Sequence, residues 1–117
     1  LIKYNGYQIA PAELEAVLLT HPGIADSAVV GSLDADGQEV PKAFVVRQPG
    51  ADGDALDVAG VVDFVAARVA PFKKIRRVEF IEAVPKSASG KILRRMLGSA
   101  GSDTGQAAVQ AAAPEKL

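Results

Sequence analysis

The stretch LIKYNGYQIAPAELEAVLLTHPG, residues 1–23, decides the fold because it specifies a hairpin with its turn and a helix with the residues that end it. Asn5-Gly6 is the favoured pair for a two-residue hairpin turn, in which both residues take positive φ angles. Counting outward from that turn places Lys3 opposite Gln8, with both side chains on one face. The opening therefore predicts a β-hairpin that presents a polar pair, although such a pair is also an ordinary feature of a hairpin.

The hairpin is followed by a pattern typical of an amphipathic helix. Pro11 suits the first helical position, and Glu13 and Glu15 lie in the first turn, where carboxylates complement the helix dipole. His21 reads as a last-turn residue with a structural rather than a catalytic role. The apolar positions at helical spacing, which we expect to be buried, are Leu14, Val17 and Leu18.

Three further segments predict strands. The apolar runs 28–31 and 43–46 flank a polar connection with an Asp-Gly pair at 36–37, which indicates two paired strands. Residues 77–81 read as a third strand, with Glu79 facing outward. These three strands are enough to form a small sheet beside the hairpin.

Helices separate and follow these strands. Asp54 is the expected cap of a second helix that Pro71 ends, and residues 92–97 form a short third one. The valines expected in the core are Val58, Val61, Val62, Val65 and Val69. This order of elements predicts an α+β fold, a small mostly antiparallel sheet with an N-terminal hairpin, packed by helices. We expect one domain over residues 1–97 and a disordered tail over residues 98–117, which are small and polar.

Composition limits the function classes. The chain has 117 residues and 49% hydrophobic content, enough for one modest core. Without cysteine it has no disulfide framework or thiolate metal site, as expected for the cytoplasm, and one histidine argues against a zinc site. No apolar run approaches the roughly 20 residues of a membrane helix, and the opening lacks a signal peptide. Because the chain begins without methionine, we expect a fragment of a longer protein.

Charge is unevenly distributed although the formal net charge is only −1. Residues 11–63 contain ten acidic and two basic side chains, whereas residues 71–95 contain eight basic and two acidic ones. One end of the domain should therefore attract anions. A solvated basic surface without a ligand would have the same composition.

The stretch PKSASGKILRR, Pro85 to Arg95, partly matches a phosphate-binding loop of the Walker type. Pro85 stands where the first glycine should be, and Ile92 occupies the position of the magnesium-binding hydroxyl. What remains is a small, flexible run through Ser89 and Gly90 that presents the ammonium group of Lys91.

Three segments together resemble a known family: LIKYNGYQIAPAELEAVLLTHPGIADSAVVG, DGQEVPKAFVV and VEFIEAVPKSASGKILRR. Over residues 1 to about 97 they resemble the C-terminal domain of the adenylate-forming acyl-CoA and aryl-CoA ligases. That superfamily includes 4-coumarate:CoA ligases, firefly luciferases and peptide-synthetase adenylation domains. The pattern looks closest to the ligase and luciferase types.

The resemblance implies a two-step reaction. ATP and a carboxylic acid form an acyl adenylate and pyrophosphate, after which the thiol of coenzyme A displaces AMP. The small domain rotates between the steps over a much larger N-terminal domain of the same polypeptide. That domain would hold most of the ATP, coenzyme A and Mg²⁺, so the fragment alone should be inactive.

The resemblance also assigns roles to residues. Lys91 matches the lysine that bridges the substrate carboxylate and the nucleotide during adenylation. Lys3, Gly6 and Gln8 match the hairpin motif that enters the active site for thioester formation, with Gly6 leaving room for the pantetheine arm. Ser89 and Gly90 would help to form the nucleotide-binding loop.

Two further roles are expectations of the same kind. The basic cluster, meaning Lys73, Lys74, Arg76 and Arg77, could contact coenzyme A phosphates, but a solvated surface explains it equally well. Pro85 to Lys91 fits the pattern recognised by protein acetyltransferases, and acetylation would remove the charge of Lys91.

Two alternative functions remain open on the sequence. The acceptor could be a carrier protein or oxygen instead of coenzyme A, and the identity of the acid is not encoded here. A noncatalytic module that binds nucleic acid through its basic runs is less favoured. The aromatic residues near those runs, Phe72 and Phe80, read as core residues and not as stacking platforms.

Overall fold

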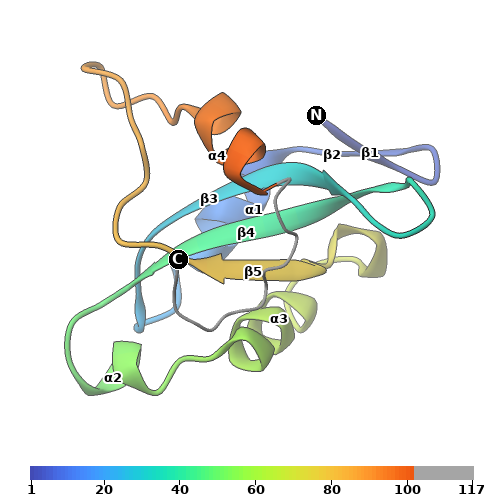
Figure 1. The fold of residues 1–117 in the computed structure, drawn as a ribbon. Coiled ribbons are helices and arrows are strands. Elements are labelled where there is room, and N and C mark those ends of the chain that lie inside the picture. Colours follow the sequence, from blue (N-terminus) through green and yellow to red (C-terminus); the bar gives the residue numbers. More distant parts are fainter. Residues whose placement is uncertain (102–117) are drawn as a thin grey trace.

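The computed structural model describes residues 1–101, with side chains through residue 97, and Figure 1 shows their arrangement. In chain order the elements are β1 (Ile2–Tyr4), β2 (Tyr7–Ile9), α1 (Pro11–Leu18), β3 (Ile24–Leu33), β4 (Glu39–Arg47), α2 (Ala51–Asp54), α3 (Val58–Ala66), a 3₁₀ turn (Pro71–Lys73), β5 (Arg77–Phe80) and α4 (Arg94–Gly101). These elements form a two-stranded hairpin, a three-stranded sheet and covering helices, so the predicted α+β class is confirmed.

The larger sheet has the strand order β3-β4-β5 and is mixed. β3 and β4 pair antiparallel, with Val29 opposite Ala43, as the two apolar runs predict. β5 instead pairs parallel to β4, with Val78 beside Ala43. A parallel neighbour needs a crossover, and the chain supplies it by passing through α2 and α3 between the two strands. Counting the hairpin, the expected antiparallel arrangement therefore holds for β1–β2 and β3–β4 and not for β4–β5.

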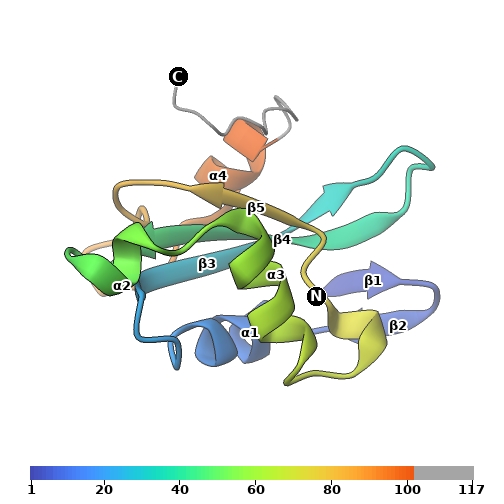
Figure 2. The ribbon, with the colours of Figure 1, turned by 90° about the horizontal axis from the view of Figure 1, so that it is seen from below.

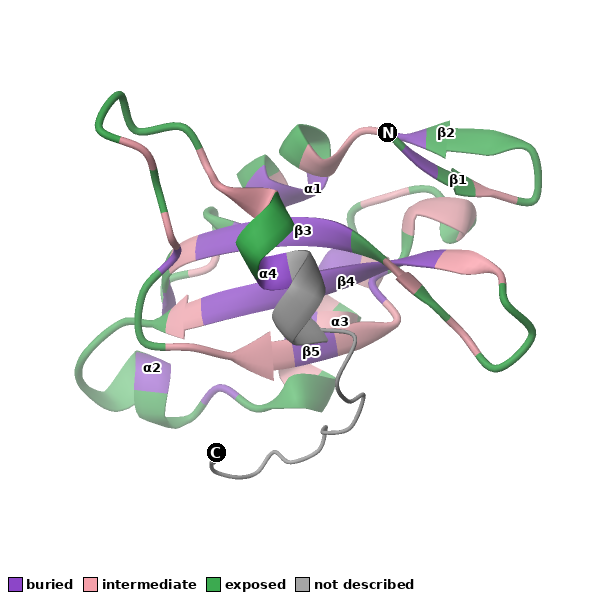
Figure 3. Ribbon diagram, turned by 45° about the horizontal axis from the view of Figure 1, so that its top comes forward, coloured by how far each residue is buried: buried purple, intermediate pink, exposed green. Residues whose placement is uncertain are grey.

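Helices cover both faces of this sheet. The main core lies on the face that α1 and α3 cover (Figure 2). Leu14 and Leu18 of α1 and Val61 and Val65 of α3 belong to it. The second core lies on the other face, beneath α4. Its buried members are Ala28, Val30, Phe44, Val84 and Leu97. Because neighbouring residues of β3 and β4 face opposite cores, both strands read as continuous apolar runs and are buried along their centres (Figure 3).

The second helix differs from its predicted form. Asp57, and not Asp54, is the N-cap of α3, and its side chain accepts a hydrogen bond from the backbone N–H of Gly60. Asp54 belongs to the short α2, so the sequence holds two possible caps close together and the later one is used. Val58, expected in the core, is 38% exposed at the first position of the helix. Pro71 opens the 3₁₀ turn after α3 has already ended.

α1 begins at Pro11 as predicted, but His21 lies beyond its end. The imidazole Nδ1 of His21 accepts a hydrogen bond from the backbone N–H of Gly23 at 2.8 Å. Its ring also meets Phe64 edge-on, with centroids 4.7 Å apart. The predicted structural role is therefore supported by these contacts, although His21 stabilises the turn and not the last turn of the helix.

The hairpin has the predicted register. Lys3 lies opposite Gln8, and Tyr4 lies opposite Tyr7. Asn5 and Gly6 have φ angles of 50° and 83°, as a two-residue turn of this kind requires. The hairpin is attached to the main core through Ile2 and Ile9 on its buried face.

The final helix, α4, runs from Arg94 to Gly101 and so extends past the expected domain boundary at residue 97. The rest of the predicted tail lies outside the described residues. Within residues 1–101, no helix is long and apolar enough to cross a membrane.

Candidate functional site

The segment 85–93, called the lysine loop below, is an ordered turn in the structure. An isolated antiparallel bridge joins Lys86 to Ile92. Inside it, the backbone N–H of Ser87 donates to the carbonyl of Lys91 at 2.9 Å, and the N–H of Gly90 donates back to Ser87. Gly90 has a φ angle of 87°, which glycine adopts without strain. The expected flexible run is thus a closed turn with its own hydrogen bonds.

Lys91 lies near the end of this turn and is exposed. Its backbone N–H donates to the Ser87 hydroxyl at 3.2 Å, so the main chain at this exposed position is held by the loop itself. Among the residues that the structure describes, no carboxylate forms an ion pair with Lys91. The ammonium group is therefore available to an anionic ligand.

Ser89 and Gly90 contribute to the shape of the lysine loop. The Ser89 hydroxyl lies 3.0 Å from that of Ser87, and either can donate. A Cβ atom at Gly90 would meet nothing within 4 Å, so glycine is required there by backbone conformation and not by space. These contacts organise the loop itself, and both backbones lie next to Lys91.

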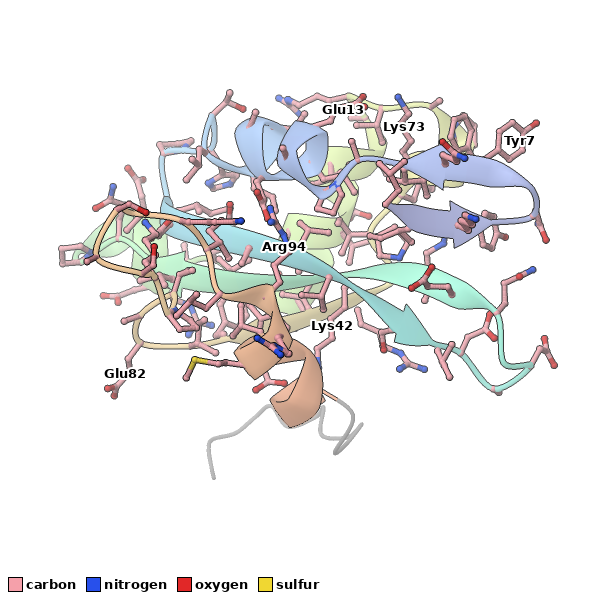
Figure 4. The ribbon with its side chains drawn as sticks, turned by 90° about the horizontal axis from the view of Figure 1, so that it is seen from above. Tyr7, Glu13, Lys42, Lys73, Glu82 and Arg94 are labelled. Carbon is pink, nitrogen blue, oxygen red and sulfur yellow. The ribbon has the colours of Figure 1, made fainter. Side chains whose placement is uncertain are left out.

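Ion pairs fasten both arms of the lysine loop to the body of the domain. Lys86 pairs with Asp26 at the start of β3, with 2.7 Å between Nζ and Oδ2. After the loop, the guanidinium of Arg94 contacts both carboxylate oxygens of Glu15 at 2.7 Å. Figure 4 shows Arg94 reaching from α4 toward α1 across β3.

Sequence reasoning missed the part played by Glu15, which was interpreted as a first-turn acid that complements the helix dipole. Glu15 is only 7% exposed. A signal was present, because Glu15 lies next to Leu14 and one turn before Leu18, on the edge of the buried stripe. The partner Arg94 is remote in sequence, so no local pattern could have revealed the pair.

The hairpin presents Lys3 and Gln8 on its exposed face, as predicted. The β3–β4 connection and the first residue of β4 support it: the Gln38 amide donates to Asn5 Oδ1, and the backbone N–H of Lys3 donates to Glu39 Oε1 at 2.8 Å. At Gly6 an added Cβ would meet nothing within 4 Å. The turn therefore leaves open space beside its backbone.

The basic cluster does not behave as one open anion site. Lys73 Nζ forms an ion pair with Glu13 at 2.7 Å, and Arg76 lies over the ring of Tyr4, 4.6 Å from its centroid. Arg77 donates to the Ser32 hydroxyl. Of these four side chains, Lys74 alone forms no hydrogen bond or ion pair with another residue of the described part of the chain. The sequence suggested one cluster, but it could not show that an acidic, an aromatic and a hydroxyl neighbour already contact three of the four side chains.

The two aromatic residues near the cluster are only partly buried. Phe72 stacks on the exposed Tyr7, with ring centroids 4.1 Å apart. Arg47 lies over Phe80 at 3.7 Å. Figure 4 places Tyr7 at the hairpin and the Lys73–Glu13 pair beside it. Both rings thus already have an intramolecular stacking partner.

The lysine loop and the hairpin lie at opposite ends of the domain, as Figures 1 and 4 show from two directions. One end presents Lys91, and the other presents Lys3 and Gln8. Residues 13–91 match the model of the family described as "AMP-binding enzyme C-terminal domain". The chain belongs to this family. The match includes Lys91, whereas the hairpin lies before its first residue.

Curated relatives agree with this assignment. The chain is 57% identical over 97 residues to 4-coumarate--CoA ligase-like 5 of Oryza sativa subsp. japonica and 53% identical to peroxisomal OPC-8:0-CoA ligase 1 of Arabidopsis thaliana. Each alignment covers 83% of this chain and 17% of the relative. The chain thus spans about one sixth of the length of these proteins.

Solved structures share the fold. An ATP-bound MatB from Rhodopseudomonas palustris superimposes with a TM-score of 0.78 at 31% identity, covering 88% of this chain and 20% of that one. An anthranilate CoA ligase in complex with anthranoyl-AMP superimposes with a TM-score of 0.75 at 33% identity, covering 85% and 19%. Similar domains therefore occur in enzymes solved with ATP and with an acyl adenylate.

Proposed function

We propose that this chain is the C-terminal domain of an AMP-forming carboxylic acid:CoA ligase, an acid–thiol ligase of the 4-coumarate:CoA ligase-like group. The observation that carries the proposal is the exposed Lys91, held by its backbone at the end of an ordered turn, in a family whose relatives are named as CoA ligases. Lys91 is the proposed catalytic group for adenylation. Lys3 and Gln8 serve the thioester step at the other end of the domain.

The chemistry of adenylation asks for a group such as Lys91. A carboxylate and a phosphate repel each other, and a compact ammonium with three donors on a flexible stem can contact both. At about 4 Å and an effective dielectric constant of about 20, one unit charge contributes about 4 kcal/mol. This corresponds to roughly a thousandfold in rate.

The hairpin is suited to the second step by its shape. The exposed face carries Lys3 and Gln8, and the space beside Gly6 admits an extended chain such as the pantetheine arm of coenzyme A. The opposite face is anchored in the core, so the exposed face is held rigidly. We propose that the domain turns this end toward the active site after adenylation.

The proposed cofactors are ATP, coenzyme A and Mg²⁺. Ser89 and Gly90 would shape the loop that carries Lys91 to ATP, and Lys74, with Lys73 and Arg76 beside it, is the candidate contact for coenzyme A phosphates. Residues 1–101 contain no group of three or more His, Cys, Asp or Glu side chains that could hold a metal ion. We therefore assign Mg²⁺ to a large N-terminal domain of the same polypeptide, together with the carboxylic acid substrate.

Regulation and compartment belong to the same proposal. The exposed Lys91 is accessible to a protein acetyltransferase, and acetylation would abolish adenylation by removing the charge. Mass spectrometry that finds Lys91 unmodified after incubation with such an enzyme would contradict this point. The absence of cysteine fits the cytoplasm, whereas one relative is named as peroxisomal.

The test is a half-reaction assay on the full-length ligase carrying Lys91→Ala. Adenylation is followed by ATP–pyrophosphate exchange, and thioester formation is followed from supplied acyl adenylate and coenzyme A. Lys86→Ala is the matched control, because Lys86 lies in the same loop but pairs with Asp26. Loss of adenylation in Lys91→Ala alone supports the proposal, and equal survival of both half-reactions contradicts it.

A further inference from the structure

Next to the lysine loop lies an ion pair between the buried Glu15 and the partly exposed Arg94, and the adenylation chemistry described above does not use it. We propose that Glu15 and Arg94 are a positioning pair that holds Lys91 in place for adenylation, an inference that rests on the proposed function. Neither side chain needs to touch substrate. Their effect is transmitted through the backbone between Lys91 and Arg94.

The contacts of the pair are charge-assisted and specific. Arg94 Nη2 lies 2.7 Å from both Oε1 and Oε2 of Glu15. The backbone N–H of Val29 donates to Glu15 Oε2 at 2.8 Å, and Arg94 Nε donates to the Val29 carbonyl at 3.2 Å. One carboxylate and one guanidinium therefore connect α1, β3 and the start of α4.

The pair also occupies a strand edge. β3 is an outer strand of the sheet, so one side of its backbone has no strand partner. Both polar backbone groups of Val29 point to that side and bond to Glu15 and Arg94, much as they would bond to a neighbouring strand. The pair is thereby locked to the rigid sheet and not merely to another side chain.

The link from Arg94 to Lys91 is short and stiff. The N–H of Leu93 donates to the Pro85 carbonyl at 2.9 Å and closes the lysine loop directly before Arg94. Ile92 packs on the second core. A change in the position of Arg94 must therefore move the C-terminal part of the loop. Lys91 lies in this part, three residues before Arg94.

A comparison with the buried Lys42 and with the neighbouring Arg95 indicates that the link from Arg94 to the loop is specific to Arg94. Lys42, 5% exposed, pairs with Glu79 across β4 and β5 and, in the part of the chain that the structure describes, forms no ion pair with the lysine loop. The neighbour Arg95 is exposed and has no ion pair in the described residues. Arg94 differs from both because it joins the loop to the sheet, and its fork reaches a carboxylate and a carbonyl together.

The experiment uses the full-length ligase with Arg94→Met and Glu15→Gln. Adenylation is measured by ATP–pyrophosphate exchange, and thioester formation is measured from supplied acyl adenylate and coenzyme A. Hydrogen exchange over residues 85–93 measures the order of the loop. We expect adenylation to fall about tenfold to a hundredfold, as for misplacement by about 1 Å, with thioester formation within about twofold. Exchange over the loop should become faster.

Matched controls separate positioning from loss of stability. Arg95→Met removes the same kind of side chain one residue later and should leave all three readouts unchanged. Val61→Ala creates a cavity in α3, far from the loop in sequence, and should lower the melting temperature without changing the ratio of the half-reactions. If Arg94→Met does not fold, Arg94→Lys keeps the charge without the fork and should give a smaller loss of adenylation.

Failure of this inference can be told from failure of the proposed function. Lys91→Ala, run in parallel, tests the function by itself. Suppose that Lys91→Ala abolishes adenylation. The positioning role is then wrong if Arg94→Met and Glu15→Gln lower both half-reactions equally, and it is also wrong if they lower neither half-reaction. If Lys91→Ala has no effect, the catalytic part of the inference also fails, and unchanged loop exchange in Arg94→Met would then overturn the anchoring part as well.

Discussion

The hairpin at residues 1–10 and the lysine loop at residues 85–93 are both tight antiparallel turns with a glycine at positive φ, yet they are stabilised in different ways. The hairpin has a regular register, set by two adjacent turn residues and two buried isoleucines. The loop has a single bridge and depends on ion pairs to β3 and α1. Two turns of similar backbone shape thus differ in origin: the register of the hairpin follows from neighbouring residues, whereas the lysine loop is held by contacts with distant parts of the chain.

The largest effects are expected when the lysine at each end of the domain is removed in turn. Lys91→Ala should lower adenylation about a thousandfold, by loss of about 4 kcal/mol of charge stabilisation. Lys3→Ala should lower thioester formation about tenfold to a hundredfold and leave adenylation within about twofold. Half-reaction assays of the full-length ligase measure both. A single variant that impairs both steps equally would break the distinction between the two ends.

The two glycines offer an intermediate effect. Gly6→Ala and Gly90→Ala place a side chain at φ angles of 83° and 87° where nothing lies within 4 Å, so the cost comes from backbone conformation alone. We expect each to lower the free energy of unfolding by about 1–2 kcal/mol, measured by urea denaturation. Only Gly90→Ala should also slow adenylation.

Gly53→Ala is the control for space. A Cβ there would overlap the backbone oxygen of Gln48, so its cost is steric and should exceed that of both turn glycines. If all three variants lose the same free energy, conformation and space cannot be separated in this way.

A smaller effect is expected from the support beneath the hairpin. Glu39→Gln replaces a charged acceptor of the Lys3 backbone N–H by a neutral one of the same shape. The loss should be about 0.5–1 kcal/mol, seen as faster hydrogen exchange of Lys3. Thioester formation should respond and adenylation should not. An effect on the lysine loop instead would show that the two ends are coupled.

The smallest effect is expected at the entry arm of the lysine loop. Lys86→Met removes the ion pair between Lys86 and Asp26. The Lys86 side chain is 40% exposed and the Asp26 side chain is 29% exposed. Solvent screens such a pair, so the free energy of unfolding should change by only about 0–1 kcal/mol. Urea denaturation measures this change. A loss larger than that caused by Glu15→Gln would reverse the ranking of the two anchors.

The contrast between the two turns also explains which predictions failed. The hairpin register follows from counting along adjacent residues, and the core valines of α3 follow from helical spacing. Asp57 displaced Asp54 as the helix cap because both satisfy the same local rule. The basic cluster looked like one anion site, but Glu13 and Tyr4 from the first part of the chain neutralise or cover two of its members. Residues distant in sequence supply these partners.

By itself the sequence determined the hairpin turn, the two apolar strands and the exposed Lys91, since each depends on residues a few positions apart. It also determined the α+β class, which follows from the order of such local elements along the chain. The tertiary structure alone decided the parallel pairing of β5, the burial of Glu15 and its contact with Arg94. Each of these joins segments separated by tens of residues. Their stability comes from packing and charge pairing that exist only after the chain has folded, so no local pattern records them.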